Sequence, residues 1–487
     1  MQYLSFTFLG FVIVVWGIYS LMPQKHRWKI LLVASLFFYM AFDVKYIFFL
    51  LFVAISTYLG ARCIAGKNNK KILWITLGCN IILWFLIKAL PWCGTILNTI
   101  VGKIIPNYVI EIPSILVPVG ISYYVLMAIS YLVDVYKGKI AAENNFAKYL
   151  LYLSYFPAVV QGPISRYEML QGQLFEGKRI SYDKFRYNIL LIAIGVIKKM
   201  VIADRVALVA NDCYENYMKL EGPILYVGAV FYSIQLYMDF SGCVDICRGV
   251  SGLFGVELID NFNAPYFAKS IKEFWSKWHI SLSSWLKDYV YIPLGGNRKG
   301  KMRKYANLLI TFLVSGIWHG AGFSFLVWGM LHGIYQIVGE LSTGIRSRIK
   351  QAMKIESGSI SERIYQTILT FNLVTFAWIF FRADTLMSAV EYISRMFSSM
   401  NMGRLFDESS FVAGLDYAQS TMLILNIVVI SVMDYYHSKK NVEVREAILN
   451  AHFFIRWSIY FLIALDILLF GVYGQGYDLS GFLYGGF

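Results

Sequence analysis

Two histidines lie in aromatic sequence that carries almost no charge. His319 is in the segment SGIWHGAG (315–322), and His279 is in FWSKWHISLSSW (274–285). An ionisable side chain at membrane depth is costly and usually marks a functional position. Neutral imidazole can accept a proton near pH 7, so either residue could act as a general base toward a substrate hydroxyl. The structural alternative is a histidine that only bonds neighbouring helices, and taken alone it suits His279 better than His319.

The sequence around His319 predicts a broken helix. Residues 305–339 contain no Lys, Arg, Asp or Glu. One straight helix of this length would be roughly 52 Å long, far more than a hydrocarbon core of about 30 Å. The run must therefore tilt, bend or break, and glycines at 316, 320 and 322 favour a break beside His319. His332 would lie about 220° around an unbroken helix from His319, so the two could share a site only if the helix breaks, and packing is the predicted role of His332.

Residues 271–289 are predicted to form one amphipathic helix that carries His279. Its apolar residues recur every three to four positions and form a single stripe, namely Phe274, Trp278, Leu282, Trp285 and Tyr289. The lysines of the segment lie off this stripe. Such a helix suits a membrane interface or the wall of a cavity.

The composition indicates a polytopic membrane protein. Of the 487 residues, 58% are hydrophobic and only 15% are charged, whereas charged residues make up about 25% of soluble domains. Residues 1–487 are predicted to form a single integral membrane domain, in which the proline-containing part 146–304 contributes re-entrant or interfacial elements. About ten to twelve spans are predicted, near 3–22, 30–42, 45–60, 72–90, 112–133, 187–203, 222–238, 305–339, 362–381, 418–433 and 453–473.

The basic residues are best explained by membrane topology. The net charge of +14 is dispersed over short loops, so nucleic acid is not an expected partner. Lys25, Arg27 and Lys29 follow the first span, which the positive-inside rule places in the cytoplasm with the N-terminus outside. The basic segment Arg298–Lys304 is predicted to be cytoplasmic by the same rule. The first span has no cleavage site and is expected to be a retained helix.

No cofactor or metal signature is present. The six cysteines lack zinc-type spacing, and there is no P-loop, G-x-S-x-G elbow or dinucleotide fingerprint. Asp239, Asp245 and Asp466 lie in or beside apolar segments. An acid there could relay protons, orient a histidine or pair with a cation such as Arg248, and structural pairing is the simpler interpretation.

Four sequence blocks resemble the membrane-bound O-acyltransferases. They are YFPAVVQGPISRYEML (155–170), QLYMDFSGCVDICRG (235–249), NFNAPYFAKSIKEFWSKWHISLSSWLKDYVYIPLGGNR (261–298) and SGIWHGAGFSFLVWGMLHG (315–333). These core motifs, within 155–333, are most similar to the bacterial branch that contains the membrane subunit of alginate O-acetylation. The subunit that transfers D-alanine to teichoic acid is a close relative.

The resemblance implies an all-α fold in which membrane helices form a ring, with re-entrant and interfacial helices around a central funnel and tunnel. His319 corresponds to the essential histidine of the family's W-H-G motif, and His279 corresponds to its second polar position. Cys243 departs from the tyrosine that this branch usually has. Further residues expected to bind substrate or line the tunnel are Trp318, Trp275, Trp278, Ser315, Asp239 and Arg298.

The function implied is acyl transfer across a bacterial cell membrane by a multi-pass protein in the lipid bilayer. The donor would be a cytoplasmic thioester, either acetyl-coenzyme A or an acyl carrier protein. The acceptor would be an exported cell-surface polysaccharide, reached through an extracytoplasmic SGNH-type transferase. One alternative is D-alanyl transfer to teichoic acid. Another is a proton-coupled transporter or flippase, although the matching halves typical of many transporters are missing.

Overall fold

The computed structural model describes residues 1, 3–66, 69–105, 108–111, 117–398, 401–403, 415–440 and 443–473. Every regular element of this part is helical, and one isolated antiparallel bridge joins Phe262 to Trp278. The predicted all-α class is therefore confirmed. The chain divides into two compact units, of which the first contains Met1–Ile192 and Cys243–Ile259 and the second contains Ala193–Gly242 and the described part of Asp260–Tyr477. The single domain and the ring around a funnel stay predictions.

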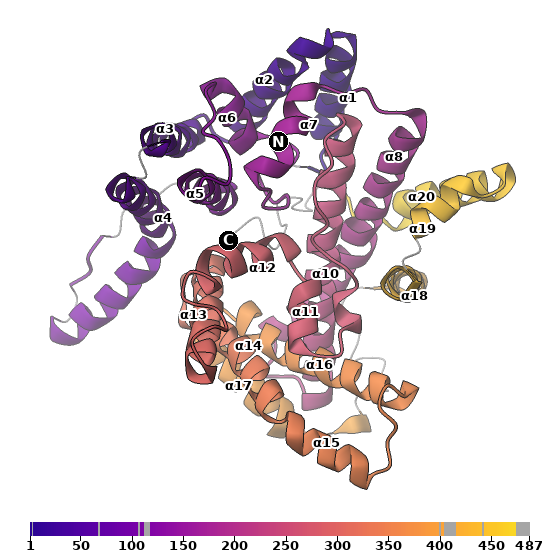
Figure 1. The fold of residues 1–487 in the computed structure, drawn as a ribbon. Helices are drawn as coiled ribbons and strands as arrows, with labels where there is room; N and C mark the ends of the chain where they lie inside the picture. Colours follow the sequence, from indigo (N-terminus) through magenta and orange to yellow (C-terminus); the bar gives the residue numbers. More distant parts are fainter. Residues whose placement is uncertain are drawn as a thin grey trace. The chain divides into compact units, whose positions relative to one another are not determined.

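The first unit is built from the N-terminal helices, drawn from indigo to magenta in Figure 1. Helix α5 is its core: nearly all of its side chains are buried, and it packs against α3, α4 and α6. The helices of this unit are α1 (Phe6–Leu21), η1 (Gln24–His26), α2 (Arg27–Met40), α3 (Tyr46–Ile64), α4 (Lys70–Ile104), α5 (Ile121–Tyr136), α6 (Phe146–Ser154), α7 (Tyr167–Glu176) and most of α8 (Tyr182–Val196).

The second unit holds both histidines of interest. Its helix α14 packs against α11, α13 and α16. Helix α10 (Gly222–Leu253) begins in this unit, and its residues from Cys243 onward belong to the first. The other elements are η2 (Ile197–Ala203), α9 (Asp204–Glu215), η3 (Pro265–Phe267), α11 (Ile271–Lys277), α12 (Ile280–Leu286), η4 (Lys287–Tyr291), α13 (Lys301–His319), α14 (Phe323–Leu341), α15 (Thr343–Ala352), α16 (Ile360–Arg382), α17 (Leu386–Ser398), α18 (Tyr417–Lys440), α19 (Val444–Asn450) and α20 (Phe453–Phe470).

Several helices have the length and composition of membrane spans. Among the described residues, five helices meet both criteria, namely α3, α4, α16, α18 and α20, and α1 and α5 are shorter apolar helices. Helix α20 has no buried residue within the protein, as expected of a helix that faces lipid. Of the predicted span 112–133, residues 112–116 lie outside the described residues, and α5 covers residues 121–133.

The predicted break beside His319 is confirmed. Helix α13 ends at His319, and α14 begins at Phe323 and returns against it. Glycines allow this close antiparallel packing: a Cβ added to Gly316 would lie 2.4 Å from the backbone oxygen of Phe325, and one added to Gly329 would lie 2.4 Å from that of Phe312. The hairpin therefore places His319 at a helix end.

The single helix predicted over 271–289 is wrong. The chain forms α11, α12 and the π-helical turn η4, with a break at His279, whose φ and ψ are 44° and 54°. The break results from pairing with a distant segment: the Asn263 amide donates to the Lys277 carbonyl at 3.0 Å, and the Ile280 amide donates to the Asn261 carbonyl at 3.0 Å. Helical periodicity cannot reveal this pairing, because residues 261–263 lie outside the apolar stripe.

Candidate active site

The fold brings His279 and His319 together inside the second unit. Their ring centroids are 6.4 Å apart with an interplanar angle of 63°, and both side chains are buried. Trp318 contacts both rings, at 5.9 Å from His279 and 4.8 Å from His319. Two residues that are 40 positions apart in sequence thus form one buried pair, and a buried neutral imidazole can act on a proton without competition from bulk water.

Aromatic rings enclose His319. The ring of Trp328, from α14, lies 5.0 Å away, and that of Phe381, from α16, lies 5.3 Å away. Both contacts are edge-to-face, an arrangement that aromatic rings favour. The wall holds the imidazole in place and excludes water from it.

His279 owes its position to an unusual backbone. Its left-handed conformation is uncommon for a non-glycine residue and costs of order 1–3 kcal/mol, which structures tend to store at functional sites. Asn261 fixes the turn, because its side-chain oxygen accepts a hydrogen bond from the Ser281 amide at 2.9 Å. The ring of Phe240, from α10, packs edge-to-face against the imidazole at 4.8 Å. The turn and this ring together hold His279 toward His319.

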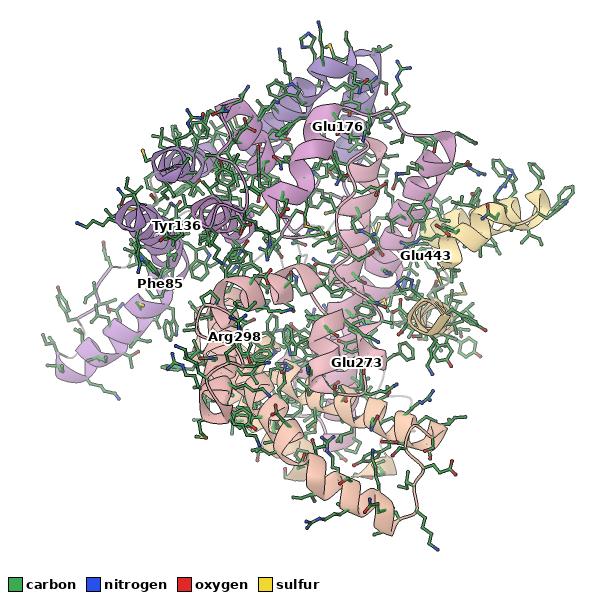
Figure 2. All side chains as sticks on the ribbon, in the orientation of Figure 1. Phe85, Tyr136, Glu176, Glu273, Arg298 and Glu443 are labelled. Atoms are coloured by element: carbon green, nitrogen blue, oxygen red, sulfur yellow. The ribbon has the colours of Figure 1, made fainter. Side chains whose placement is uncertain are left out.

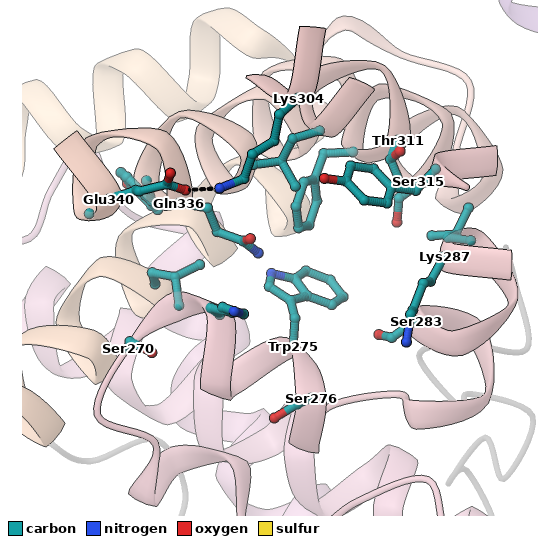
Figure 3. Close-up of a pocket in the computed structure, with 18 of the residues that line it drawn as sticks. Ser270, Trp275, Ser276, Ser283, Lys287, Lys304, Thr311, Ser315, Gln336 and Glu340 are labelled. Carbon is teal, nitrogen blue, oxygen red and sulfur yellow. Dashed lines mark hydrogen bonds and ion pairs between the residues drawn. The ribbon is translucent and has the colours of Figure 1, made fainter. Parts of the chain in front are cut away.

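A cavity of about 830 Å³ is lined by sequence neighbours of both histidines, and neither histidine is itself part of the lining. Its lining comes from α11, α12, η4, α13, α14 and α15 and includes Ser315, one helical turn before His319, and Ile280, which directly follows His279. Figure 3 shows Trp275 projecting into the middle of this space, with Ser315 and Thr311 together on one wall. The Ser315 hydroxyl is buried and has no hydrogen-bond partner within the described residues. It is therefore available to a ligand in the cavity.

Basic side chains dominate the charged lining of this cavity. Lys272, Lys287, Lys304 and Arg346 line it, together with the acidic Glu340. Lys304 forms an ion pair with Glu340, drawn as a dashed line in Figure 3. A concave site with an excess of positive charge attracts anions.

Three of the predicted site residues lie elsewhere in the second unit. Arg298, labelled in Figure 2, is exposed in the loop before α13 and is not part of the cavity lining. Trp278 is fully buried and packs at 5.2 Å against Trp378. Asp239 forms an ion pair at 2.5 Å with Lys199. Whether these residues bind substrate stays a prediction.

Lys199 is the centre of a buried ionic cluster. Its ammonium group also contacts Asp204 at 2.8 Å, and the side chains of Lys199, Asp204 and Asp239 are no more than 7% exposed. The expectation of structural pairing for Asp239 fits this geometry. The predicted cation Arg248 pairs with Asp245 at 3.8 Å in the first unit.

Sequence reasoning missed several residues around the histidines. Lys199 had a usable signal, because a lysine in the apolar stretch IGVIKKM should have a buried acidic partner. No such signal identified Phe240, Trp328 or Phe381, because the sequence does not show which ring one aromatic residue among many will face. Within the described residues, no group of three or more His, Cys, Asp or Glu side chains is arranged to hold a metal ion. The absence of metal and cofactor stays a prediction.

Comparison with known proteins decides the family. The model of the membrane-bound O-acyltransferase family matches residues 38–381, which is well over half of the chain. The chain belongs to the membrane-bound O-acyltransferases. The O-acyltransferase activity and the multi-pass membrane character predicted from the sequence are therefore confirmed. Membership of this family rules against the alternative of a transporter or flippase.

Three relatives show which activities occur among similar members of the family. A Pseudomonas putida protein named as a probable alginate O-acetylase is 32% identical over 441 residues, which cover 89% of this chain and 88% of the relative. A Helicobacter pylori peptidoglycan O-acetyltransferase is 34% identical over 426 residues, or 81% and 77% of the two chains. A Bacillus subtilis teichoic acid D-alanyltransferase is 28% identical over 230 residues, or 44% and 57%.

Proposed function

We propose that this O-acyltransferase moves an acetyl group from a cytoplasmic thioester to a hydroxyl group for O-acetylation of an exported cell-surface polysaccharide. The observation that carries the proposal is the buried pair of His279 and His319 beside a basic cavity. The names of two relatives, an alginate O-acetylase and a peptidoglycan O-acetyltransferase, support acetyl as the group and a polysaccharide as the acceptor. The bacterial cell membrane is the corresponding location.

The donor enters the cavity from the end at which Lys304 and Arg346 lie. The basic lining suits an anionic thioester donor, either the phosphates of acetyl-coenzyme A or an acyl carrier protein. The positive-inside rule supports a cytoplasmic position for the adjacent segment Arg298–Lys304 and an external N-terminus. The thioester then lies near Ser315, whose buried hydroxyl can donate a hydrogen bond to the carbonyl oxygen.

Acyl transfer follows from the positions of the two histidines. His319 accepts the proton of the acceptor hydroxyl as its oxygen attacks the thioester carbonyl carbon. The carbon–sulfur bond breaks, and the proton passes from His319 to the leaving sulfur, so the free thiol and the new ester are the products. His279 positions the donor or polarises its carbonyl. The surrounding aromatic rings limit hydrolysis by water.

The immediate acceptor is the active-site hydroxyl of an extracytoplasmic SGNH-type transferase or a hydroxyl of the polymer itself. The chain resembles family members that pass the acyl group to such a separate exported protein. D-alanyl transfer to teichoic acid has weaker support, because two relatives with that name match only 44% and 54% of this chain. Supplying the purified protein with a D-alanyl carrier protein in place of acetyl-coenzyme A, and measuring transfer from each donor, distinguishes the two.

The test of this function is ester formation by histidine variants in cells that make the acceptor polymer. We expect His319→Ala to reduce base-labile acetyl on the polymer by at least about 10²-fold, which is the low end for removing a general base. His452→Ala is the matched control, because His452 is an exposed histidine at the start of α20. Cells with this variant should acetylate the polymer at the wild-type level. Wild-type acetylation by a normally expressed His319→Ala protein would refute the assignment.

Orientation is tested separately with single cysteines. A cysteine at Lys299 should react with an impermeant thiol reagent supplied from the cytoplasmic side, whereas one at Gly222 should not. The opposite pattern would overturn the proposed direction of transfer.

A further inference from the structure

Trp275 and His332 form a buried hydrogen-bonded pair at the cavity. The indole N–H of Trp275 donates to Nδ1 of His332 at 3.2 Å. An indole nitrogen only donates, so Nδ1 must be unprotonated and the proton of the neutral ring lies on Nε2. Nε2 is buried and has no partner within the described residues. The bond to Trp275 is therefore the polar contact that fixes the tautomer of this histidine.

Rings on several sides hold His332 in one orientation. Its ring is parallel to that of Phe274 within 5° at 6.3 Å and lies edge-to-face to Trp328 at 5.2 Å and to Tyr335 at 6.1 Å. The side chain is 0% exposed. A histidine packed in this way cannot change rotamer without moving its neighbours. It is thus a rigid acceptor for the indole.

Trp275 is the ring that connects the cavity with the enclosure of His319. It lines the cavity and contacts Trp328 at 5.8 Å, and Trp328 contacts His319 at 5.0 Å. Figure 3 shows its indole projecting into the open space among the lining residues. The cavity as a whole, at about 830 Å³, is far too large to select a two-carbon acyl group. Selection must come from what stands beside the acyl end of the donor.

We propose that His332 is a positioning residue that holds Trp275 as a stop for the acyl chain, so that acetyl thioesters react and longer acyl thioesters are excluded. This proposal rests on the proposed function, because it takes the cavity to be the donor site. Without the bond to His332 the indole can rotate away, and the space that it leaves admits additional methylene groups.

The test compares acyl lengths in three purified variants. His332→Leu removes the acceptor, Trp275→Phe shortens the stop, and His332→Asn is the matched control that retains an oxygen near the position of Nδ1. Each additional methylene that a hydrophobic pocket accepts or rejects is worth about tenfold or more in kcat/KM. We expect the ratio of kcat/KM for butyryl-coenzyme A to that for acetyl-coenzyme A to rise about tenfold or more in His332→Leu and Trp275→Phe. His332→Asn should keep the wild-type ratio.

Binding of unreactive donors provides a second readout that does not depend on turnover. Thioether analogues of coenzyme A that carry two-carbon and four-carbon alkyl groups on sulfur are compared by thermal stabilisation of each variant. The longer analogue should stabilise His332→Leu and Trp275→Phe more than it stabilises the wild type. An unchanged length preference in both variants would overturn the role of His332 while leaving the proposed function intact. Failure of the two-carbon analogue to stabilise the wild type would overturn the donor site and, with it, this proposal.

Discussion

The buried cluster of Lys199, Asp204 and Asp239 leads to a stability prediction whose size can be worked out. Lys199 places its one positive charge 2.5 Å from Asp239 and 2.8 Å from Asp204. Replacing Lys199 by Met leaves two carboxylates next to each other in the interior. Removing one partner of a buried ion pair costs about 3–5 kcal/mol, since the remaining charge loses its compensation. We expect Lys199→Met to lower the free energy of unfolding by an amount in this range.

Neutralising the whole cluster should recover much of that loss. The triple variant Lys199→Met, Asp204→Asn, Asp239→Asn contains no buried charge at these positions, and replacing a complete buried ion pair is often close to neutral. The exposed Lys219 supplies the control, because Lys219→Met should change stability by no more than about 0.5 kcal/mol. The measurement is the thermal unfolding midpoint in detergent. It is obtained from the fraction of protein that still elutes as a monodisperse peak after heating.

The order of the thermal midpoints tests whether the cluster is a compensated ionic unit. Wild type and Lys219→Met should be highest, the triple variant intermediate and Lys199→Met lowest. A midpoint of Lys199→Met equal to that of the wild type would refute the view that the cluster is a compensated ionic unit. So would a triple variant that is less stable than Lys199→Met.

Three further perturbations test the elements that position the site. Gly316→Ala should open the α13–α14 hairpin and lower both stability and activity, since its Cβ would lie 2.4 Å from the backbone oxygen of Phe325; thermal midpoints measure this. His279→Val should be less stable than His279→Asn by about 1–2 kcal/mol, because a β-branched residue tolerates the left-handed backbone poorly. Lys287→Glu should raise the KM for acetyl-coenzyme A with little change in kcat, an effect that shrinks in high salt.

Each of these three predictions has a control variant or an outcome that would contradict it. Gly339→Ala is the control for the hairpin, because a Cβ there meets nothing within 4 Å, and equal midpoints for the two alanine variants would contradict the close approach. Equal stability of the two His279 variants would show that the turn carries no strain. An unchanged KM in Lys287→Glu would exclude electrostatic attraction of the donor at that position.

The helix break beside His319 could be predicted from the sequence because its causes are local. An apolar run that is too long for the membrane and three nearby glycines were sufficient. The position of His279 could not be predicted in the same way. Its helix is interrupted by pairing with Asn261 and Asn263, and a contact with a separate segment leaves no mark in the periodicity of residues 271–289.

The pairing of charged and aromatic side chains was only partly predictable. Asp239 required a cation, but Lys199 is 40 residues away and belongs to a π-helical turn, so several basic residues were equally good candidates. The sequence predicts packing for His332, because an unbroken helix would direct it away from His319. The break brings both histidines against Trp328, and the bond to Trp275 gives His332 a specific partner.

The most direct test of His319 as the base follows acetyl transfer by purified protein in liposomes. Labelled acetyl-coenzyme A is supplied on the side that contains Lys304, and the proposed acceptor, an SGNH-type transferase, is supplied on the other. Wild type should release free thiol and label the acceptor in equal amounts. His319→Gln, which keeps a polar side chain but offers no base, should do neither above background. Transfer by His319→Gln at the wild-type rate would contradict the assignment of His319 as the base.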